Sequence, residues 1–234
     1  MVTLTYQERF KTFQGVFDEH TERNLFELQS KGIFDELLSP LKIGKESNVF
    51  IAVKDNRKII VKIYRVQNCD FKRMYGYIRQ DPRYSYLKHH RRQIIFAWTQ
   101  REFRNLKYAE KAGINAPKPL AFCDNIIIEE MIGDKDPAPP LKDVYPKNPR
   151  KCFDEVITSI KKLYQQGLIH GDLSAFNILI DKEKPYFIDF SQATVVKTPN
   201  SQELMQRDIK NMVTFFKKLG VERKAEEIIK EVTA

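Results

Sequence analysis

The side chains best suited to chemistry lie in two short segments of the second half of the chain. In the first, His170, Asp172 and Asn177 have the spacing H-x-D-x-x-x-x-N in a loop that runs into an apolar strand. A carboxylate at Asp172 can accept or orient the proton of an attacking oxygen, and the Asn177 amide oxygen can help to hold a divalent metal. We expect His170 to brace the loop through hydrogen bonds. In the second segment, Asp189 follows an apolar strand twelve residues after Asn177 and is a candidate Mg²⁺ ligand.

A basic residue upstream extends this pattern. Lys62 lies in the middle of an apolar strand, where a protein kinase places the lysine that binds the α- and β-phosphates of ATP. A lysine in such a strand needs a partner, and Glu102 on a following helix is the expected one. Alternation along the strand leaves open that Lys62 faces solvent, but the downstream loop favours a Lys62–Glu102 ion pair. Taken together, the segments predict a site for phosphoryl transfer from ATP.

The turn expected to cover the phosphates differs from known phosphate loops. Residues 43–50 contain only Gly44, where the kinase pattern G-x-G-x-x-G has three glycines, and Glu46 stands where a Walker loop has Ser or Thr. Lys45 and the Ser47 hydroxyl could replace some of the backbone contacts to phosphate. The same residues are also compatible with a plain turn.

The elements that must position these residues begin with helices and continue as a sheet. Apolar residues at helical spacing predict one or two amphipathic helices that end near Gly32: Phe10, Phe13, Phe17, Leu25, Leu28 and Phe34. Strands are then predicted over 41–44, 48–53 and 58–64, followed by a long helix over 93–112. Two more strands are predicted over 118–122 and 126–131.

A Gly- and Pro-rich segment, residues 133–140, predicts a hinge between two lobes. Beyond it we expect a helix over 153–166, short strands over 178–180 and 186–188, and helices over 202–219 and 222–232. The predicted fold class is therefore α+β, with an N-terminal antiparallel sheet plus one major helix and a helical C-terminal lobe. The expected divisions are a helical extension over 1–38, an N-terminal lobe over 39–132 and a C-terminal lobe over 133–234.

The segment between Lys62 and Glu102 is longer than a strand–helix connection requires and is strongly basic. Between residues 70 and 92 aromatic side chains alternate with basic ones, namely Lys72, Arg73, Arg79, Arg83, Lys88, Arg91 and Arg92. Basic residues contact phosphates and aromatic rings stack on bases, so this composition suits RNA. A solvated loop, or one folding back over the nucleotide, is the alternative. We expect a flexible basic loop over about 67–92 that contacts a partner.

Composition narrows the class of protein. The 234 residues carry a formal net charge of +9, and 42% of them are hydrophobic, which is enough to bury a core. No apolar stretch is long enough for a membrane span, and the N-terminus lacks the pattern of a signal peptide. Cys69, Cys123 and Cys152 form neither a CxxC motif nor a zinc pattern, so free thiols in a reducing compartment are expected. These features favour a cytoplasmic protein with no membrane partner.

Five segments together resemble the RIO family of atypical serine/threonine protein kinases, in the compact archaeal form of the first-described subfamily. They are Gly44-Lys45-Glu46-Ser47-Asn48-Val49, Val61-Lys62-Ile63-Tyr64-Arg65, Glu102-Phe103-Arg104-Asn105-Leu106, His170-Gly171-Asp172-Leu173-Ser174 and Ile188-Asp189-Phe190-Ser191-Gln192-Ala193. The resemblance runs from about Asn24 to the C-terminus in the family's order. It implies a trimmed kinase fold with an extra N-terminal helix, and no A-P-E motif follows Asp189.

The resemblance also implies roles for individual residues. Asp172 would be the catalytic acceptor and Lys62 the phosphate-binding lysine, while Asn177 and Asp189 would bind Mg²⁺, with Mn²⁺ as an alternative. Asp189 would also take the γ-phosphate of ATP transiently as an aspartyl-phosphate. At the hinge, backbone groups of Glu130 and Ile132 would meet adenine.

The partners implied by the resemblance are a protein serine or threonine, or the chain itself, and pre-small-ribosomal-subunit particles or rRNA. Family members resemble ATPase switches in small-subunit maturation more than dedicated peptide kinases. Three residues depart from the family pattern. Ser191 replaces the usual glycine, Ser47 stands where alanine is common, and Glu129 stands where a larger apolar residue is common.

Two other functions are compatible with the motifs. The chain could be an ATP-binding scaffold on pre-ribosomes without significant turnover. It could also be a small-molecule phosphotransferase of the aminoglycoside or choline kinase type, because these enzymes share the His170-Gly171-Asp172 pattern. Gly44-Lys45-Glu46 and Ser191-Gln192-Ala193 favour the RIO family, and retention of every phosphate- and metal-handling residue favours an active enzyme.

Overall fold

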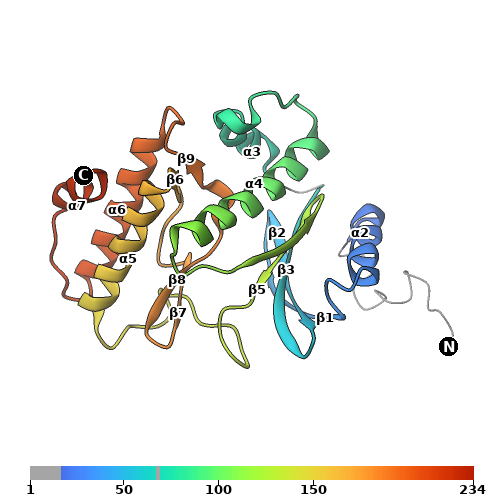
Figure 1. The fold of residues 1–234 in the computed structure, drawn as a ribbon, viewed down its shortest axis with the longest axis horizontal. Helices are drawn as coiled ribbons and strands as arrows, with labels where there is room; N and C mark the ends of the chain where they lie inside the picture. Colours follow the sequence, from blue (N-terminus) through green and yellow to red (C-terminus); the bar gives the residue numbers. More distant parts are fainter. Residues whose placement is uncertain (1–16, 67–68) are drawn as a thin grey trace.

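Two lobes, one built on an antiparallel sheet and one mainly helical, lie side by side in the protein (Figure 1). The computed structural model describes residues 17–66 and 69–234. The α+β two-lobe fold with an additional N-terminal helix, predicted from the sequence, is confirmed. The helix predicted around Phe10 and Phe13 lies outside the described residues, and the helix after it is α2, Glu19–Ser30.

The N-terminal lobe is a five-stranded antiparallel sheet in the order β1-β2-β3-β5-β4. Its strands are β1 (Glu36–Ile43), β2 (Ser47–Lys54), β3 (Arg57–Tyr64), β4 (Pro119–Cys123) and β5 (Ile126–Glu130). The first strand begins earlier than its predicted start at residue 41. It is an edge strand whose residues are almost all exposed, so it lacks the apolar alternation that reveals a strand. Pro40 lies within it, which an edge strand tolerates.

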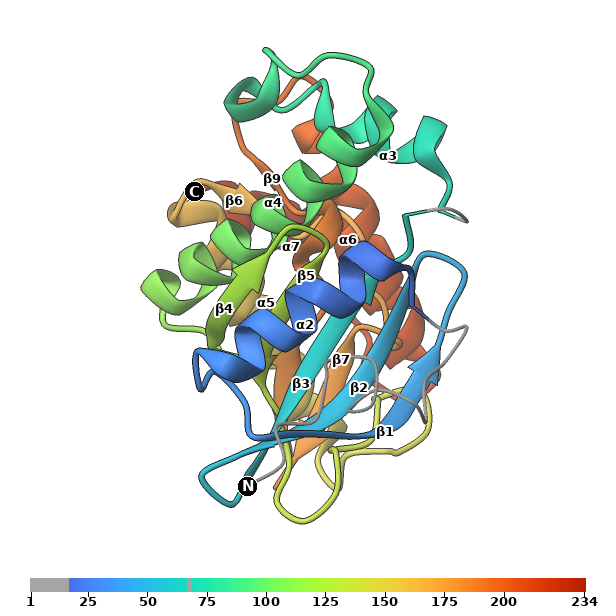
Figure 2. The same cartoon turned by 90° about the vertical axis from the view of Figure 1, so that its right-hand side faces the viewer.

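Two helices cover the two faces of this sheet. Figure 2 shows α2 crossing in front of the sheet, where Leu25 and Leu28 pack into a core with Phe50, Val61 and Ile128. The α2 helix begins at the N-cap Asp18, whose side chain accepts a hydrogen bond from the Thr21 backbone N–H at 2.8 Å. On the other face, α4 (Arg91–Ala112) lies between the sheet and the C-terminal lobe. This helix ends at Gly113, which has the left-handed conformation predicted for a helix terminator.

The C-terminal lobe contains three helices and two small sheets. The helices are α5 (Pro149–Gln165), α6 (Ser201–Lys217) and α7 (Ala225–Thr233). One sheet pairs β7 (Ile178–Asp181) with β8 (Lys184–Phe187), and the other pairs β6 (Leu168–Ile169) with β9 (Thr194–Val195). The β6 and β9 strands were not predicted, because two residues are too few to show a period. Between the sheets, the short 3-10 helix η3 spans Phe190–Gln192.

The basic insertion is folded rather than a loop over most of its length. It contains α3 (Phe71–Ile78) and the 3-10 helix η2 (Pro82–Tyr84), and both pack against α4. Asp70 caps the start of α3 by accepting a hydrogen bond from the Arg73 N–H at 3.1 Å. Tyr84, one of the rings expected to be available for bases, is buried instead. Its neighbour Tyr86 is exposed.

Two further expectations concern the chain as a whole. Within residues 17–66 and 69–234, none of the helices combines the length and the apolar composition that a membrane span requires. Cys69, Cys123 and Cys152 are free thiols, and Cys69 and Cys152 are buried.

Candidate active site

Lys62 lies between two carboxylates at the junction of the lobes. From the middle of β3, its ammonium donates to Glu102 Oε1 at 2.8 Å and to Asp189 Oδ1 at 3.0 Å. The Lys62 side chain is 8% exposed and that of Glu102 is 1% exposed, so the alternative in which Lys62 faces solvent is wrong. The predicted Lys62–Glu102 ion pair is present. Asp189 joins the same group from the other lobe.

Tyr64 is a member of this cluster that the sequence analysis missed. Its hydroxyl donates to Glu102 Oε2 at 2.5 Å, so both oxygens of the Glu102 carboxylate have a partner. Lys62 and Tyr64 are two residues apart on one strand and therefore point to the same face of the sheet. That spacing was a usable signal for the contact.

The charges of this cluster fix one another. Burial alone would lower the pKa of Lys62, but the carboxylates of Asp189 and Glu102 raise it well above its ordinary value. Burial would raise the pKa of Asp189, but the Lys62 charge and hydrogen bonds from Ser191 and Lys62 hold it well below its usual range. Asp189 is therefore an anion at neutral pH. Its side chain is 40% exposed, so the carboxylate is accessible to solvent.

The loop after β6 carries Asp172 and Asn177 to the same place. Asn177 donates its side-chain N–H to the Asp172 backbone carbonyl at 2.8 Å, which leaves the amide oxygen as the end able to bind a cation. Asp172 Oδ2 accepts a hydrogen bond from the Gln192 side chain at 3.0 Å. The backbone N–H of Ile188 donates to the Asn177 carbonyl at 3.0 Å, so Asn177 and Asp189 lie at the same end of the β7–β8 hairpin.

His170 braces this loop, as predicted. Its Nε2 lies 3.0 Å from the backbone carbonyl of Ile188, to which it donates. Burial lowers the pKa of His170 to about 4, so the ring is neutral at physiological pH. For Asp172, burial and then the nearby Asp189 charge raise the pKa above its ordinary value. A more basic carboxylate is suited to accepting a proton.

Helix α6 anchors the backbone of this loop through residues that the sequence analysis did not single out. Asp208 accepts the backbone N–H groups of Gly171 at 2.7 Å and Leu173 at 2.8 Å. Arg207 donates to the Gly171 carbonyl and Asn211 to the Leu173 carbonyl. Burial raises the pKa of Asp208 to about 7, against the lowering effect of the two N–H groups. An acidic residue on a predicted amphipathic helix is usually solvated, so no feature of the sequence singles out Asp208.

The segment after Asp189 explains one departure from the family pattern. The residue in the left-handed region is Asp189 itself, at φ 60° and ψ 67°, whereas Ser191 lies in η3. Aspartate tolerates this conformation better than most residues. The Ser191 side chain instead hydrogen-bonds to Asp189 and helps to keep it ionised. A serine at this position therefore adds a contact to the candidate metal ligand.

Glu129, the second departure, is a buried carboxyl on β5, the strand that pairs with the Lys62 strand β3. It pairs in register with Ile60 of β3, two residues from Lys62, and is 9% exposed. Burial and then the Glu102 charge raise the pKa of Glu129 to about 8. Glu129 therefore holds its proton at neutral pH and adds no further negative charge to those of Glu102 and Asp189.

The predicted hinge groups follow directly after Glu129. The Glu130 backbone N–H donates to the Lys118 carbonyl at 2.9 Å, and the Ile132 carbonyl accepts from the Ala138 N–H at 2.8 Å. The carbonyl of Glu130 and the N–H of Ile132 are the groups not used in these two hydrogen bonds. They are a donor and an acceptor of the kind that an adenine edge requires.

Lys45 and Ser47 lie at the turn between β1 and β2. Gly44 is required there, because a Cβ would come within 2.7 Å of the Ser47 carbonyl oxygen, to which the Gly44 N–H donates at 3.0 Å. In the described part of the chain, no hydrogen bond or ion pair joins the side chains of Lys45 or Ser47 to Lys62 or Asp189. The turn is thus a neighbour of the Lys62 cluster and not a member.

A buried polar network connects the basic insertion to η3. Asp81, which is fully buried, accepts from Arg83 Nη2 at 2.6 Å and from Arg101 Nε at 3.1 Å. Arg101 also reaches the backbone carbonyls of Ser191 and Gln192, both at 3.4 Å. In addition, the Asn105 amide on α4 donates to the Phe190 and Ala193 carbonyls at 3.0 and 2.7 Å. The segment after Asp189 is therefore held by α4 and the insertion together.

The side-chain oxygens of Asn177 and Asp189 are of the kind that binds a small hard cation. Mg²⁺ is usually held by one or two protein carboxylates together with phosphate oxygens and water. Asn177 and Asp189 would supply two oxygen ligands. Within residues 17–66 and 69–234, no group of three His, Cys, Asp or Glu side chains could hold a metal by itself. A cation bound here would therefore need a nucleotide or water to complete its shell.

The fold resembles that of a solved kinase of known family. The Rio2 kinase from Chaetomium thermophilum, in a complex described as ADP/Mg²⁺-phosphoaspartate, superposes with a TM-score of 0.70 at 23% identity. The alignment covers 90% of this chain and 65% of that chain. At this identity the likeness concerns the fold alone.

Sequence comparison identifies the family. The RIO domain model matches residues 48–229. A RIO-type serine/threonine-protein kinase Rio1 from Methanocaldococcus jannaschii is 41% identical over 230 residues, or 97% of this chain and 79% of the relative. The Rio1 protein of Haloferax volcanii is 36% identical over 228 residues, with the same coverage of both chains. The chain therefore belongs to the RIO family of serine/threonine-protein kinases, in the group that contains the archaeal Rio1 proteins.

Proposed function

We propose that this kinase transfers the γ-phosphoryl group of ATP to a protein serine or threonine, to itself or to water, through an aspartyl-phosphate on Asp189. The observation that carries the proposal is that the Lys62 ammonium meets the carboxylates of Glu102 and Asp189, which come from different lobes. Lys62 lies 3.0 Å from Asp189. Burial and then the charge of Asp189 raise the pKa of Asp172.

The nucleotide would bind with its phosphates against Lys62 and its adenine at the hinge. In this arrangement the Glu130 carbonyl and the Ile132 N–H meet the base, while Lys45 and the Ser47 hydroxyl lie over the phosphates. Asn177 and Asp189 hold Mg²⁺, or Mn²⁺ in its place, and the metal neutralises phosphate charge when bound. The partly exposed carboxylate of Asp189 supports its access to the γ-phosphate.

The proposed reaction has two steps, each of which transfers the phosphoryl group. An oxygen of Asp189 attacks the γ-phosphorus, the bond from this phosphorus to the β–γ bridging oxygen breaks, and ADP leaves. A serine or threonine hydroxyl, or water, then attacks the phosphorus while its proton passes to Asp172. The bond to Asp189 breaks and its carboxylate is restored. The raised pKa of Asp172 supports the role of proton acceptor, and the phosphoaspartate named in the Rio2 complex supports the intermediate.

We further propose that the kinase acts in the cytoplasm on pre-small-ribosomal-subunit particles and that the basic insertion contacts rRNA. The net charge of +9 and the exposed Lys72 and Arg79 support an anionic partner. Tyr86 supports stacking on a base, since it is 71% exposed. The buried Tyr84 and the Asp81-bound Arg83 are not available for such contacts.

The test of the intermediate is labelling with γ-labelled ATP and Mg²⁺, followed by hydroxylamine, which cleaves acyl phosphates. We expect hydroxylamine-labile label in the parent chain and none in Asp189→Asn. In Asp172→Asn the label should form but turn over slowly, because its acceptor lacks a base. Hydroxylamine-stable label would contradict the intermediate and indicate direct transfer to serine or threonine. Tight ATP binding without any label would indicate an ATP-binding scaffold.

A further inference from the structure

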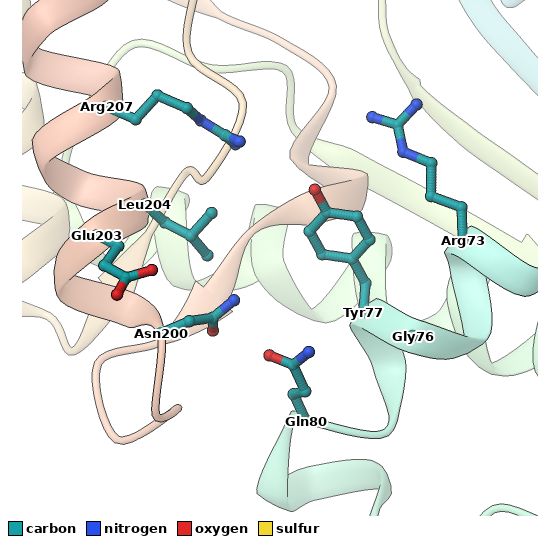
Figure 3. Close-up of a pocket in the computed structure, with 8 residues that line it drawn as sticks. All are labelled: Arg73, Gly76, Tyr77, Gln80, Asn200, Glu203, Leu204 and Arg207. Carbon is teal, nitrogen blue, oxygen red and sulfur yellow. The ribbon is translucent and has the colours of Figure 1, made fainter.

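An open cavity of about 530 Å³ lies between the basic insertion and the start of α6 (Figure 3). We call it the α3–α6 pocket. Its polar lining comes from two segments far apart in the sequence: Arg73, Tyr77 and Gln80 on one side, and Asn200, Glu203 and Arg207 on the other. Its formation depends on the helical fold of the insertion. The sequence alone predicts a loop there and therefore no cavity.

The pocket opens beside the catalytic loop. Arg207, on its wall, donates a hydrogen bond to the backbone carbonyl of Gly171, the residue before Asp172. The charges of both Arg207 and Arg73 act to lower the pKa of Asp172, against the larger raising effects of burial and Asp189. A group bound between these arginines is thus close to the carboxylate that would take the acceptor's proton.

The lining combines two cations with one anion. Figure 3 shows Arg73 and Arg207 reaching toward the same space from opposite walls, with the Tyr77 hydroxyl pointing between them. The Arg73 guanidinium lies 5.9 Å from the centre of the Tyr77 ring. Glu203 is the one carboxylate among the lining residues. Two guanidinium groups separated by a gap suit a single anionic side chain that enters between them.

Asn200, which lines the pocket at the start of α6, has a buried side-chain oxygen that lacks a hydrogen-bond donor. Asn200 is the N-cap residue of α6, but its side chain makes no capping hydrogen bond. Its Oδ1 is buried and has no hydrogen-bond partner among the described residues. Buried acceptors without a donor are rare and costly. The charge of the lining favours a polypeptide over a nucleic acid, because Glu203 would repel a row of phosphates.

We propose that the α3–α6 pocket binds the phosphoacceptor segment of a protein substrate and that Arg73 and Arg207 select an acidic side chain beside the accepting serine or threonine. The selectivity extends the proposed kinase reaction and rests on it. A carboxylate and a phosphorylated side chain share the required charge, so the test includes both. The binding itself requires no turnover and can be measured separately.

The test uses the full chain and fluorescent peptides in which alanine replaces the acceptor serine. One peptide has aspartates around this alanine, a second has lysines, and a third has phosphoserine in place of one aspartate. We expect Arg73→Glu to lower the affinity for the aspartate peptide about tenfold, since one attraction becomes a repulsion. Fluorescence anisotropy measures this affinity. Lys197→Glu is the matched control, because it makes the same charge change at an exposed residue that lies three positions before Asn200 and outside the pocket. It should change the affinity less than twofold.

A charge exchange distinguishes direct contact from a structural effect. Arg73→Glu should bind the lysine peptide more tightly than the parent chain does. Stronger binding of the phosphoserine peptide than the aspartate peptide would identify a phosphorylated segment as the occupant. Equal loss of affinity in Arg73→Glu and Lys197→Glu would overturn the proposal. Displacement of the peptide by single-stranded RNA that binds more tightly and depends on Arg73 would also overturn it.

The same peptides with serine restored separate this proposal from the proposed function. Phosphoryl transfer that is indifferent to flanking charge and to Arg73→Glu would overturn the selectivity while leaving the kinase reaction standing. Peptide binding that depends on Arg73, without transfer to any peptide, would support the pocket and contradict protein phosphorylation.

Discussion

Nζ of Lys62 lies 3.0 Å from Oδ1 of Asp189, and this ion pair joins the two lobes across 127 positions of the sequence. The same ammonium is bound to Glu102 on α4. The position of α4, the strand β3 and the candidate metal ligand are therefore determined together. A displacement of any one of them would leave a buried charge without its partner.

Removal of Lys62 should consequently affect both stability and turnover. Lys62→Met leaves the Glu102 carboxylate, 1% exposed, with only the Tyr64 hydroxyl as a partner. Breaking a buried pair in this way costs about 3 kcal/mol. We expect that loss in urea unfolding at pH 7, together with loss of ATP turnover by more than about a hundredfold.

Lys58→Met is the control for this change. Lys58 lies on the same strand, but its ion pair with Asp136 is exposed and 3.9 Å long. Its removal should cost less than about 1 kcal/mol. Equal destabilisation by the two substitutions would contradict the special role of the buried pair.

The network around Asp81 supports a second prediction. Asp81→Ala removes the carboxylate bound by Arg83 and Arg101, and the Arg101 side chain is 1% exposed. Unfolding should require about 3 kcal/mol less free energy, because a buried guanidinium loses its counter-charge. Combining Asp81→Ala with Arg101→Met should recover part of this loss, since neither charge is then left alone. In Asp154→Ala, which breaks an exposed pair with Arg150, the change should stay within about 0.5 kcal/mol.

These two cases show how far the sequence could lead. Lys62, Asp172 and Asn177 stand at spacings that reflect their chemistry, so their convergence could be anticipated without coordinates. Asp81 and Arg101 carry no such spacing. Asp81 lies in a polar insertion that has no clear period, and Arg101 lies twenty positions further on, on α4. Only the folded structure brings them together.

The boundaries of elements were limited by the same physics. Helix α4 begins at Arg91, close to the predicted 93, because its apolar stripe is long. The edge strand β1 and the two-residue strands β6 and β9 bury too few alternating side chains to reveal themselves. Asp208 was hidden for another reason. An acidic residue on a helix is usually solvated, and its contacts with a loop 35 positions away have no local signature.

Asp208 is expected to act as a positioning residue for the catalytic loop. In Asp208→Asn, one carboxamide oxygen remains to accept what two carboxylate oxygens now accept, the N–H groups of Gly171 and Leu173. The loop should no longer hold Asp172 in a fixed position, which lowers kcat about tenfold to a hundredfold. Nucleotide affinity should change less than about threefold, because Asp208 does not contact Lys62, the predicted phosphate-binding lysine.

Lys210→Ala serves as the comparison on the same helix, since Lys210 is exposed. It should leave kcat unchanged. If Asp208→Asn lowered nucleotide affinity as much as kcat, the substitution would have changed the structure of the whole site. That result would contradict a local positioning role.

Glu129 leads to a prediction on pH. Its pKa is about 8 in the folded chain, against an ordinary 4.5, through burial and then the charge of Glu102. As the pH rises from about 5 to 8, the unfolded chain releases this proton and the folded chain retains it. The free energy of unfolding therefore falls with rising pH through this window, by at most about 1.4 kcal/mol for each pH unit. At pH values below 4.5 the proton is bound in both states and Glu129 contributes no slope.

Glu129→Gln should remove this contribution, because a neutral amide of the same shape has no proton to retain. Urea unfolding measured at intervals from pH 5 to pH 8.5 should give curves that diverge, with the variant more stable than the parent by about 2 to 4 kcal/mol at pH 8. The difference between the curves isolates Glu129 from Asp208 and other groups that titrate in both proteins. Glu130→Gln, a change at the adjacent exposed residue, should leave the slope as it is. Parallel curves for Glu129→Gln and the parent would mean that Glu129 is already ionised at neutral pH, and that the Lys62 ammonium then balances three carboxylates instead of two.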